Sequence, residues 1–271
     1  MGEVKKFQRS ANDETVLSIP NLSKDWLEAK HQLLLMRKFG NDRYDISYPR
    51  PTAFTDKNLR CWAAYNLHPV YFPKEIVDER WMETAPPGWV KPNQAFYQLI
   101  DSGRLSLESF RFSPGWYLAD FTPLFIVNEN LVQAKAENDP FAPILQAVRE
   151  SGYVASWKVA SELIAIDSRY IFTANEWFRE VLPAMAKKFG VEDERVRLER
   201  AIEFNWLANL YDPWRGNYPI SQWFYDTMKP RSWPDWCLIG GNFCLGGVAH
   251  IEECASDKWS SSITARPLIK F

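Results

Sequence analysis

The spacing of apolar residues predicts helices in four stretches of the chain. The first helix has an N-cap at Ser23, runs to about Lys38 and stops at Gly40. The second begins at Asp139-Pro140 and stops at Gly152. Its inward-facing positions are apolar residues spaced three or four apart, namely Phe141, Ile144, Leu145 and Val148.

The third helix is the clearest, because its first turn carries a capping box. In Thr173-Ala174-Asn175-Glu176 the threonine hydroxyl and the glutamate carboxylate can accept hydrogen bonds from the free amides at the helix start. We expect this helix to run to Lys188, to end at Gly190 and to be kinked at Pro183. The fourth stretch, residues 195–210, has the pattern of a short amphipathic helix.

Between these helices the pattern predicts short strands and ordered loops. Prolines recur throughout residues 48–92 and prohibit long helices there. Residues 109–128 contain two strand-like runs, which are interrupted at Pro114-Gly115 and at Pro123. From Tyr211 onward the pattern is almost entirely that of loops and short strands.

Composition adds large aromatic anchors to this picture. The 271 residues include 13 Trp, and 15% of the chain is aromatic, with 18 Pro against 12 Gly. These values indicate a loop-rich fold held by large aromatic side chains, and the length suits one elaborated domain or one and a half. Tryptophans interleaved with charges between Asp212 and Trp259 could form a stacking platform for a sugar or a single-stranded nucleic acid. The near-neutral charge favours the alternative, a tryptophan core beneath loops.

Charge and hydropathy argue against two classes of partner. The net charge of -2 gives no basic footprint for nucleic acid or for an anionic membrane. No apolar run approaches the roughly 18 residues of a membrane-spanning helix, and the first residues lead into no apolar signal core. We therefore expect neither nucleic-acid binding nor membrane insertion.

The segment GGNFCLGGVAHIEEC, residues 240–254, contains side chains that suggest metal or nucleophilic chemistry. Cys244, His250 and Cys254 do not have the spacing of tetrahedral zinc ligands, and a Cys–His pair would need a third group to orient it. We therefore expect no metal, no cofactor and no catalytic residue. The two glycine pairs match no phosphate-binding pattern, so we expect them to supply positive φ angles and close backbone approach.

Motifs spread over residues 170–271 follow the order found in one branch of the C-type lectin-like proteins. They are the helix Thr173–Lys188, the segment Arg197–Phe204 with its Arg197, Leu198 and Glu203, the segment Gly216–Trp223, and the final set of Gly240–Phe243, Val248–His250 and Ile263–Pro267. This part of the chain resembles the formylglycine-generating and sulfatase-modifying branch. The resemblance implies an α+β, C-type lectin-like fold that is loop-rich, with short strands and a few helices.

Two roles compete within that branch, and the first is enzymatic. Oxidases that convert cysteine to formylglycine carry two active-site cysteines a short step apart. Here Cys244 stands near the first position, but Ala249 stands about where the second would fall. A sulfoxide synthase would need a histidine-rich module, and the chain has 3 His. The resemblance therefore implies a protein that is not an enzyme, with a formylglycine-generating-type enzyme and a non-variable structural module as the alternatives.

The second role is that of the variable protein of a diversity-generating retroelement. These proteins use the same fold and carry a variable region near the C-terminus, and the placement of Ile263–Leu268 fits that arrangement. The chain resembles the archaeal, viral and small-genome bacterial members. The resemblance implies an N-terminal segment of residues 1–95 packed on a C-type lectin-like domain of residues 96–271, with a variable region at about 235–264.

The resemblance further implies a ligand-binding face made of diversified residues. Adenine-directed mutagenesis of AAY codons cannot produce Trp, Met, Lys, Glu or Gln, so residues such as Trp236 and Trp259 would belong to the scaffold. The candidate ligand-binding residues are those it can produce: Cys237, Leu238, Asn242, Phe243, Cys244, Leu245, His250, Ile251, Cys254, Ser256, Ser260, Ser261 and Ser262. The expected partner is a protein or glycan on a target surface. A place on a virion or a cell surface would suit that role, and the sequence leaves the oligomeric state open.

Overall fold

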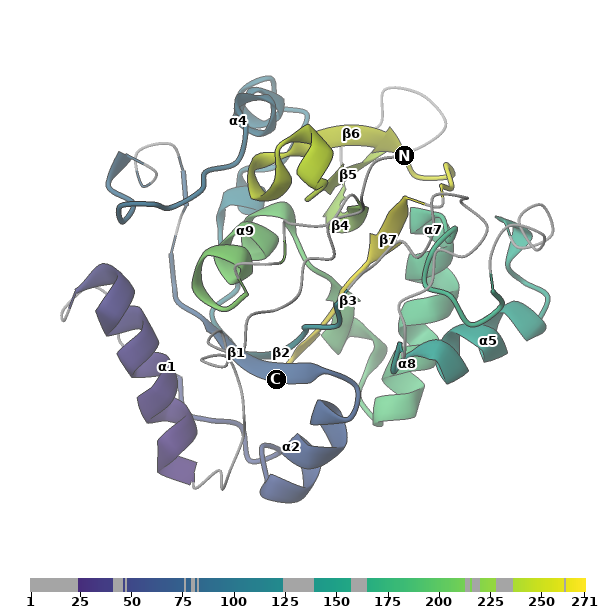
Figure 1. Ribbon diagram of the computed structural model, residues 1–271, viewed down its shortest axis with the longest axis horizontal. Helices are drawn as coiled ribbons and strands as arrows, with labels where there is room; N and C mark the ends of the chain where they lie inside the picture. The colour runs from purple at the N-terminus through teal and green to yellow at the C-terminus, as the bar shows by residue number, and fades with distance from the viewer. Residues whose placement is uncertain are drawn as a thin grey trace, which may run out of the picture.

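The computed structural model describes residues 24–40, 46, 48–75, 77–78, 81, 83–123, 139–156, 165–212, 215, 220–227, 236–260 and 262–271. These residues form a mixed α+β structure with two four-stranded sheets. Helix α1 lies on one side of the sheets, and α5, α7 and α8 lie on the other (Figure 1). The α+β class predicted from the sequence is therefore confirmed.

The described helices are short. They are α1 (Lys24–Phe39), α2 (Asp56–Ala63), α4 (Gln94–Asp101), α5 (Ala142–Glu150), α7 (Ala174–Glu176), α8 (Leu182–Phe189) and α9 (Ala201–Leu210), with the 3-10 turns η2 (Leu107–Phe110), η5 (Asp193–Arg195), η6 (Phe243–Leu245) and η7 (Gly247–Ala249) and the π turn η4 (Trp177–Val181).

The first sheet has the strand order β1-β2-β8-β3, and its neighbouring strands are antiparallel. It joins strands that are far apart in the sequence: β1 (Leu67–Phe72), β2 (Gly115–Asp120), β3 (Val196–Leu198) and β8 (Pro267–Lys270). Because β1 and β8 both pair with β2, a strand from the predicted N-terminal segment shares a sheet with the last strand of the chain.

The second sheet has the order β6-β5-β4-β7. Its strands are β4 (Ser221–Thr227), β5 (Trp236–Gly240), β6 (Ile251–Ala255) and β7 (Ile263–Ala265). The β4–β7 pair is parallel and the other two pairs are antiparallel. Strands β5, β6 and β7 lie within the range predicted to be variable or directly at its end, so this sheet supports the candidate ligand-binding residues.

Two predicted helices are confirmed with their stop signals. Helix α1 ends at Phe39 and is followed by Gly40 with φ +89°, while its predicted cap, Ser23, lies outside the described residues. Helix α5 ends at Glu150, just before Gly152 with φ +80°. Its four predicted inward-facing residues are all buried: Phe141, Ile144, Leu145 and Val148.

The predicted capping box is confirmed at the start of α7. The Glu176 amide donates to the Thr173 hydroxyl over 3.1 Å, and the Thr173 amide donates to the Glu176 carboxylate over 2.9 Å. The helix continues through η4 and α8 to Phe189, and Gly190 ends it in the left-handed conformation. The irregularity at Pro183 takes the form of the π turn that precedes it, since proline has no amide to donate to the previous turn.

Two predictions about local structure are wrong. Residues 195–210 do not form one helix, because Val196–Leu198 pairs with β8 and α9 begins only at Ala201. Helix α9 is also buried on nearly every side instead of being amphipathic. In residues 109–123, only the second strand-like run forms a strand, β2, whereas the first contains the end of η2. Residues 124–128 of that prediction lie outside the described residues.

Aromatic residues from distant parts of the sequence meet in the core, as the composition suggests. The Trp206 ring of α9 stacks on Phe39 of α1 with centroids 5.3 Å apart. It also contacts Trp89, at 5.4 Å, and Phe112, at 5.0 Å. Trp223 of β4 is fully buried, which fits a supporting core and not a stacking platform at that position.

Candidate functional site

The segment between β5 and β6 has a backbone that requires glycine. Gly241, Gly246 and Gly247 have φ values of +86°, +123° and +61°. At Gly240 a Cβ atom would lie 2.1 Å from the carbonyl oxygen of His250, far inside contact distance. The prediction that the two glycine pairs supply positive φ angles and close approach is confirmed, and the segment 241–250 is therefore held by its backbone.

Contacts from other parts of the chain fix this segment further. Asn93, the cap of α4, donates from its amide to the Ala249 carbonyl over 2.7 Å and from its side chain to the Ile251 carbonyl over 2.9 Å. Arg104 holds the Glu253 carboxylate at 2.6 Å. Strand β6 and the turn before it are thus attached to α4 and to the residues that follow it.

The structure divides the candidate ligand-binding residues by exposure. Leu245 is 58% exposed and Cys244 is exposed beside it. Partial exposure is shared by Asn242, Ser260 and Ser262. The buried members are Cys237, Leu238, His250, Ile251, Cys254 and Ser256. Nothing is described for the Phe243 side chain, and Ser261 lies outside the described residues.

The buried members belong to the frame of the second sheet. Cys237 stands directly opposite Cys254 in the β5–β6 pairing, and Leu238 is fully buried beside it. The Ser256 carbonyl and hydroxyl accept hydrogen bonds from Asn175 at the start of α7. In this conformation these side chains pack against the protein and do not face a ligand.

The exposed members lie at opposite ends of strand β6. Cys244 and Leu245 precede the strand in η6, whereas Ser260 and Ser262 follow it. Five residues of strand separate the two groups, which corresponds to about 16 Å at the usual rise per residue. The exposed candidates therefore fall into two groups, one before and one after β6.

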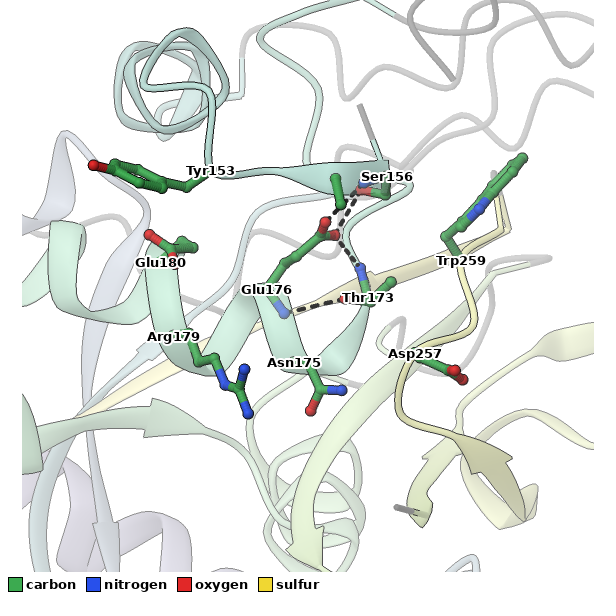
Figure 2. Close-up of a pocket in the computed structure, with 10 residues that line it drawn as sticks. Tyr153, Ser156, Thr173, Asn175, Glu176, Arg179, Glu180, Asp257 and Trp259 are labelled. Atoms are coloured by element: carbon green, nitrogen blue, oxygen red, sulfur yellow. Dashed lines mark hydrogen bonds between the residues drawn. The ribbon is translucent and has the colours of Figure 1, made fainter. Parts of the chain in front are cut away.

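A pocket of about 450 Å³ adjoins the second of these groups. Figure 2 shows Tyr153 and Trp259 on opposite sides of it, with Glu176 between them. Other lining residues come from the start of the capped helix and from the turn after β6, among them Asn175, Arg179, Glu180 and Asp257. Two sequence signals fall at this position. The capping box indicated a helix start, and Trp259 ends the tryptophan-rich run that was considered as a stacking platform for a sugar.

The floor of the pocket is saturated with internal hydrogen bonds. Besides its bond from Thr173, the Glu176 carboxylate accepts bonds from the Ser156 amide at 2.8 Å and from the Ser156 hydroxyl at 2.6 Å. Asn175 donates to Ser256 over 3.1 Å. These groups have little capacity left for a ligand, so they act as support.

The rim of the pocket is different. Among the described residues, no hydrogen bond or ion pair engages the polar ends of five rim side chains: Tyr153, Arg179, Glu180, Asp257 and Trp259. Tyr153 is 75% exposed. A set of uncommitted donors and acceptors around a recess has the general form of a small-ligand site.

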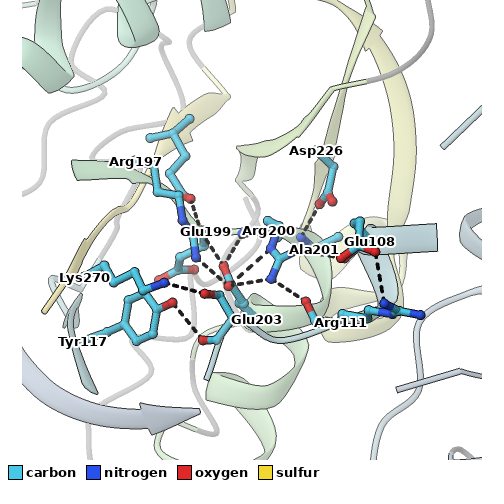
Figure 3. Close-up of polar contacts among 12 residues, drawn as sticks. Glu108, Arg111, Tyr117, Arg197, Glu199, Arg200, Ala201, Glu203, Asp226 and Lys270 are labelled. Atoms are coloured by element: carbon cyan, nitrogen blue, oxygen red, sulfur yellow. Dashed lines mark hydrogen bonds and ion pairs between the residues drawn. The ribbon is translucent and has the colours of Figure 1, made fainter. Parts of the chain in front are cut away.

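Charged networks in the core hold the two sheets and α9 in register. Arg169 donates to Asp120 at 2.6 Å and to Asp139 at 2.5 Å, all three side chains being buried. Arg197 and Arg200 both pair with Glu203 of α9 (Figure 3). Burial by itself would raise the pKa of Glu203, but the two guanidinium groups lower it to about 2.

Arrangements for metal or membrane chemistry are not found in the described part of the chain. Its histidines, cysteines and acidic residues form no group that could hold a metal ion. None of its helices combines the length and the apolar character that crossing a bilayer requires. Burial raises the pKa of the Cys254 thiol, which disfavours the reactive thiolate.

Comparisons with protein-family models, with curated proteins and with solved structures found no significant match to this chain.

Proposed function

We propose that this protein is the ligand-binding variable protein of a diversity-generating retroelement, built on a C-type lectin-like scaffold. The proposal rests on one observation within the predicted variable region: some candidate side chains are buried in the second sheet, and others are exposed outside its strands. The candidate residues within strands β5 and β6 are buried, whereas the exposed candidate side chains lie in the segments on either side of β6.

Such a separation is what a diversified binding protein requires. The backbone of residues 241–250 is set by glycine geometry and by hydrogen bonds from Asn93, so it does not depend on the identity of Cys244 or Leu245. Side chains of varied size on a rigid backbone can create new binding surfaces without loss of the fold. The ligand class that suits this role is a protein or glycan on a target surface.

The proposal is tested with a library in which the exposed candidate positions are randomised. The randomised residues are Asn242, Cys244, Leu245, Ser260 and Ser262. The displayed library is selected against one fluorescently labelled soluble protein, and the fraction of folded members is measured in parallel with thermal unfolding. We expect most members to fold and the selection to recover binders that lose binding when the five residues are restored.

A matched library controls for the general tolerance of exposed turns. It randomises five positions of the exposed 3-10 turn η5 and its surroundings, Lys188, Glu192, Asp193, Glu194 and Arg195. We expect far fewer binders from this second library. Equal recovery from both, or unfolding of most members of the first, would contradict the proposal.

A further inference from the structure

We infer that the pocket beside the capped helix binds an uncharged saccharide. Two aromatic side chains, Tyr153 and Trp259, stand on opposite sides of the recess, with Glu176 between them and the uncommitted polar groups of Glu180, Arg179 and Asp257 lower in the view (Figure 2). The volume of about 450 Å³ lies within the range typical of small-ligand sites.

The aromatic side chains suit the apolar faces of a sugar ring. The Tyr153 ring is 75% exposed, although burying such a ring in the core would be favourable. The Trp259 ring lies across the recess and is half-buried. Each ring offers a flat apolar surface with a polar tip, a combination that can contact the C–H face of a sugar and one of its hydroxyls together.

The remaining rim groups suit hydroxyls. Glu180 and Asp257 offer carboxylate oxygens that accept hydrogen bonds, and Arg179 offers a fork of donors. None of the three has a hydrogen bond or ion pair among the described residues. Since a saccharide hydroxyl both donates and accepts, a ring with several hydroxyls can satisfy all three side chains at once.

The charge of the pocket decides between neutral and acidic sugars. Three carboxylates, Glu176, Glu180 and Asp257, face one guanidinium, Arg179. The Thr173 amide already donates to the Glu176 carboxylate and the Glu176 amide to the Thr173 hydroxyl, so these two amides are not available to an anion. A sialylated or phosphorylated ligand would meet net repulsion, whereas an uncharged sugar would not.

This inference adds a ligand class to the proposed function. It rests on the proposed function only where it assumes that residues next to the pocket vary. Tyr153, Arg179 and Glu180 lie outside the range 235–264, and tryptophan at position 259 cannot arise from AAY mutagenesis. These four side chains therefore belong to the constant part of the protein and would recognise a constant element of the ligand, whereas Asp257 lies within the range that varies.

The experiment uses the full chain and an array of neutral and sialylated oligosaccharides. The oligosaccharides that bind are then titrated by saturation-transfer NMR with the wild type, Trp259→Ala and Tyr153→Ala. We expect binding to neutral oligosaccharides and a loss of roughly tenfold or more in affinity for each variant. Tyr48→Ala, a change at an exposed tyrosine outside the pocket, is the control and should leave the affinity unchanged.

A double substitution, Glu180→Gln with Asp257→Asn, separates hydrogen bonding from charge. It should retain part of the neutral-sugar binding and should weaken the discrimination against sialylated sugars. Absence of neutral-sugar binding, a preference of the wild type for sialylated sugars, or unchanged affinity in Trp259→Ala would overturn the inference. Any of these results would leave the library result for Cys244 and Leu245 intact, so the two proposals fail independently.

Discussion

The Arg197 guanidinium meets the Glu203 carboxylate at two points, with Nη1 2.6 Å from Oε2 and Nη2 2.7 Å from Oε1 (Figure 3). The Arg200 amide adds a third bond to the same carboxylate at 2.9 Å. This pairing links β3 to the first turn of α9, which packs against the second sheet. A fully buried carboxylate thus connects both sheets through one helix.

Replacing Glu203 should therefore be costly. We expect Glu203→Gln to lower the free energy of unfolding by about 3–5 kcal/mol, because it leaves the Arg197 charge without its partner. Urea unfolding at neutral pH measures the change. The control is Glu192→Gln, which removes an exposed pair with Arg195 and should cost less than about 1 kcal/mol. Equal costs for the two variants would show that the buried pair does not have this role.

Two histidines should make the fold sensitive to mild acid. Burial, aided by Lys30, lowers the pKa of His31 to about 3, and burial lowers that of His68 to about 4. The unfolded chain therefore takes up these protons first as the pH falls below the ordinary value of 6.5. The contribution of each neutral histidine to the free energy of unfolding is fully present above pH 6.5 and decreases as the pH falls. Between pH 7 and pH 5 the decrease is about 2 kcal/mol for each histidine.

The measurement compares urea midpoints at pH 7 and pH 5 for the wild type and for a variant with both histidines changed to Gln. The difference between the two pH values should shrink in the variant, whatever its overall stability. Burial raises the pKa values of Glu199 and Asp226, so the folded state takes up their protons first and is stabilised as the pH falls. Both residues are present in the wild type and in the variant, so their effect cancels when the two pH dependences are compared. A variant with the full pH dependence of the wild type would disprove the assignment.

Two glycines exclude a side chain for different physical reasons, a close backbone contact at Gly240 and a positive φ angle at Gly103. Gly240→Ala places a methyl group 2.1 Å from the His250 carbonyl oxygen and should destabilise by about 1–3 kcal/mol or more. Gly103→Ala has open space around the added carbon but a φ of +68°, so it should cost only about 1–2 kcal/mol. Thermal unfolding and the recovery of soluble protein measure both. If Gly240→Ala is the milder change, the close approach is not a constraint.

The exposure of two leucines in the predicted variable region predicts which of them can be substituted without loss of stability. Leu245→Ala should alter the free energy of unfolding by less than about 0.5 kcal/mol, because the side chain is 58% exposed. Leu238→Ala should cost about 2–5 kcal/mol, because Leu238 is fully buried in β5. Chemical denaturation of both variants tests this. A large loss for Leu245→Ala would place that residue in the core and remove it from the proposed face.

Local signals in the sequence predicted local structure well. The capping box at Thr173 and Glu176 lies within four residues, and the stops at Gly40, Gly152 and Gly190 depend only on the conformation that glycine allows. The α2 and α4 helices carry similar signals, since Thr55 and Asn93 cap them, and a search for caps alone would have found both.

Pairing between distant segments could not be predicted in the same way. Residues 196–198 have an acceptable helical pattern, and only the pairing of Arg197 with Leu268 in β8 makes them a strand. The pocket likewise unites three segments, near residues 153, 176 and 257, whose contact no short motif records. The burial of Cys237, Leu238 and Cys254 also follows from the sheet pairing and not from the codons that can encode them.

If residues around 235–264 are diversified on a constant frame, the DNA that flanks the coding region carries the record of it, and sequencing that DNA is the decisive measurement. We expect a second, near-identical copy of the segment that encodes these residues, beside a reverse-transcriptase gene. Differences between the copies should fall at adenines of the second copy and should include the codons of Asn242, Cys244 and Leu245. Flanking DNA without such a copy, or a copy whose differences show no bias toward adenine, would contradict the account.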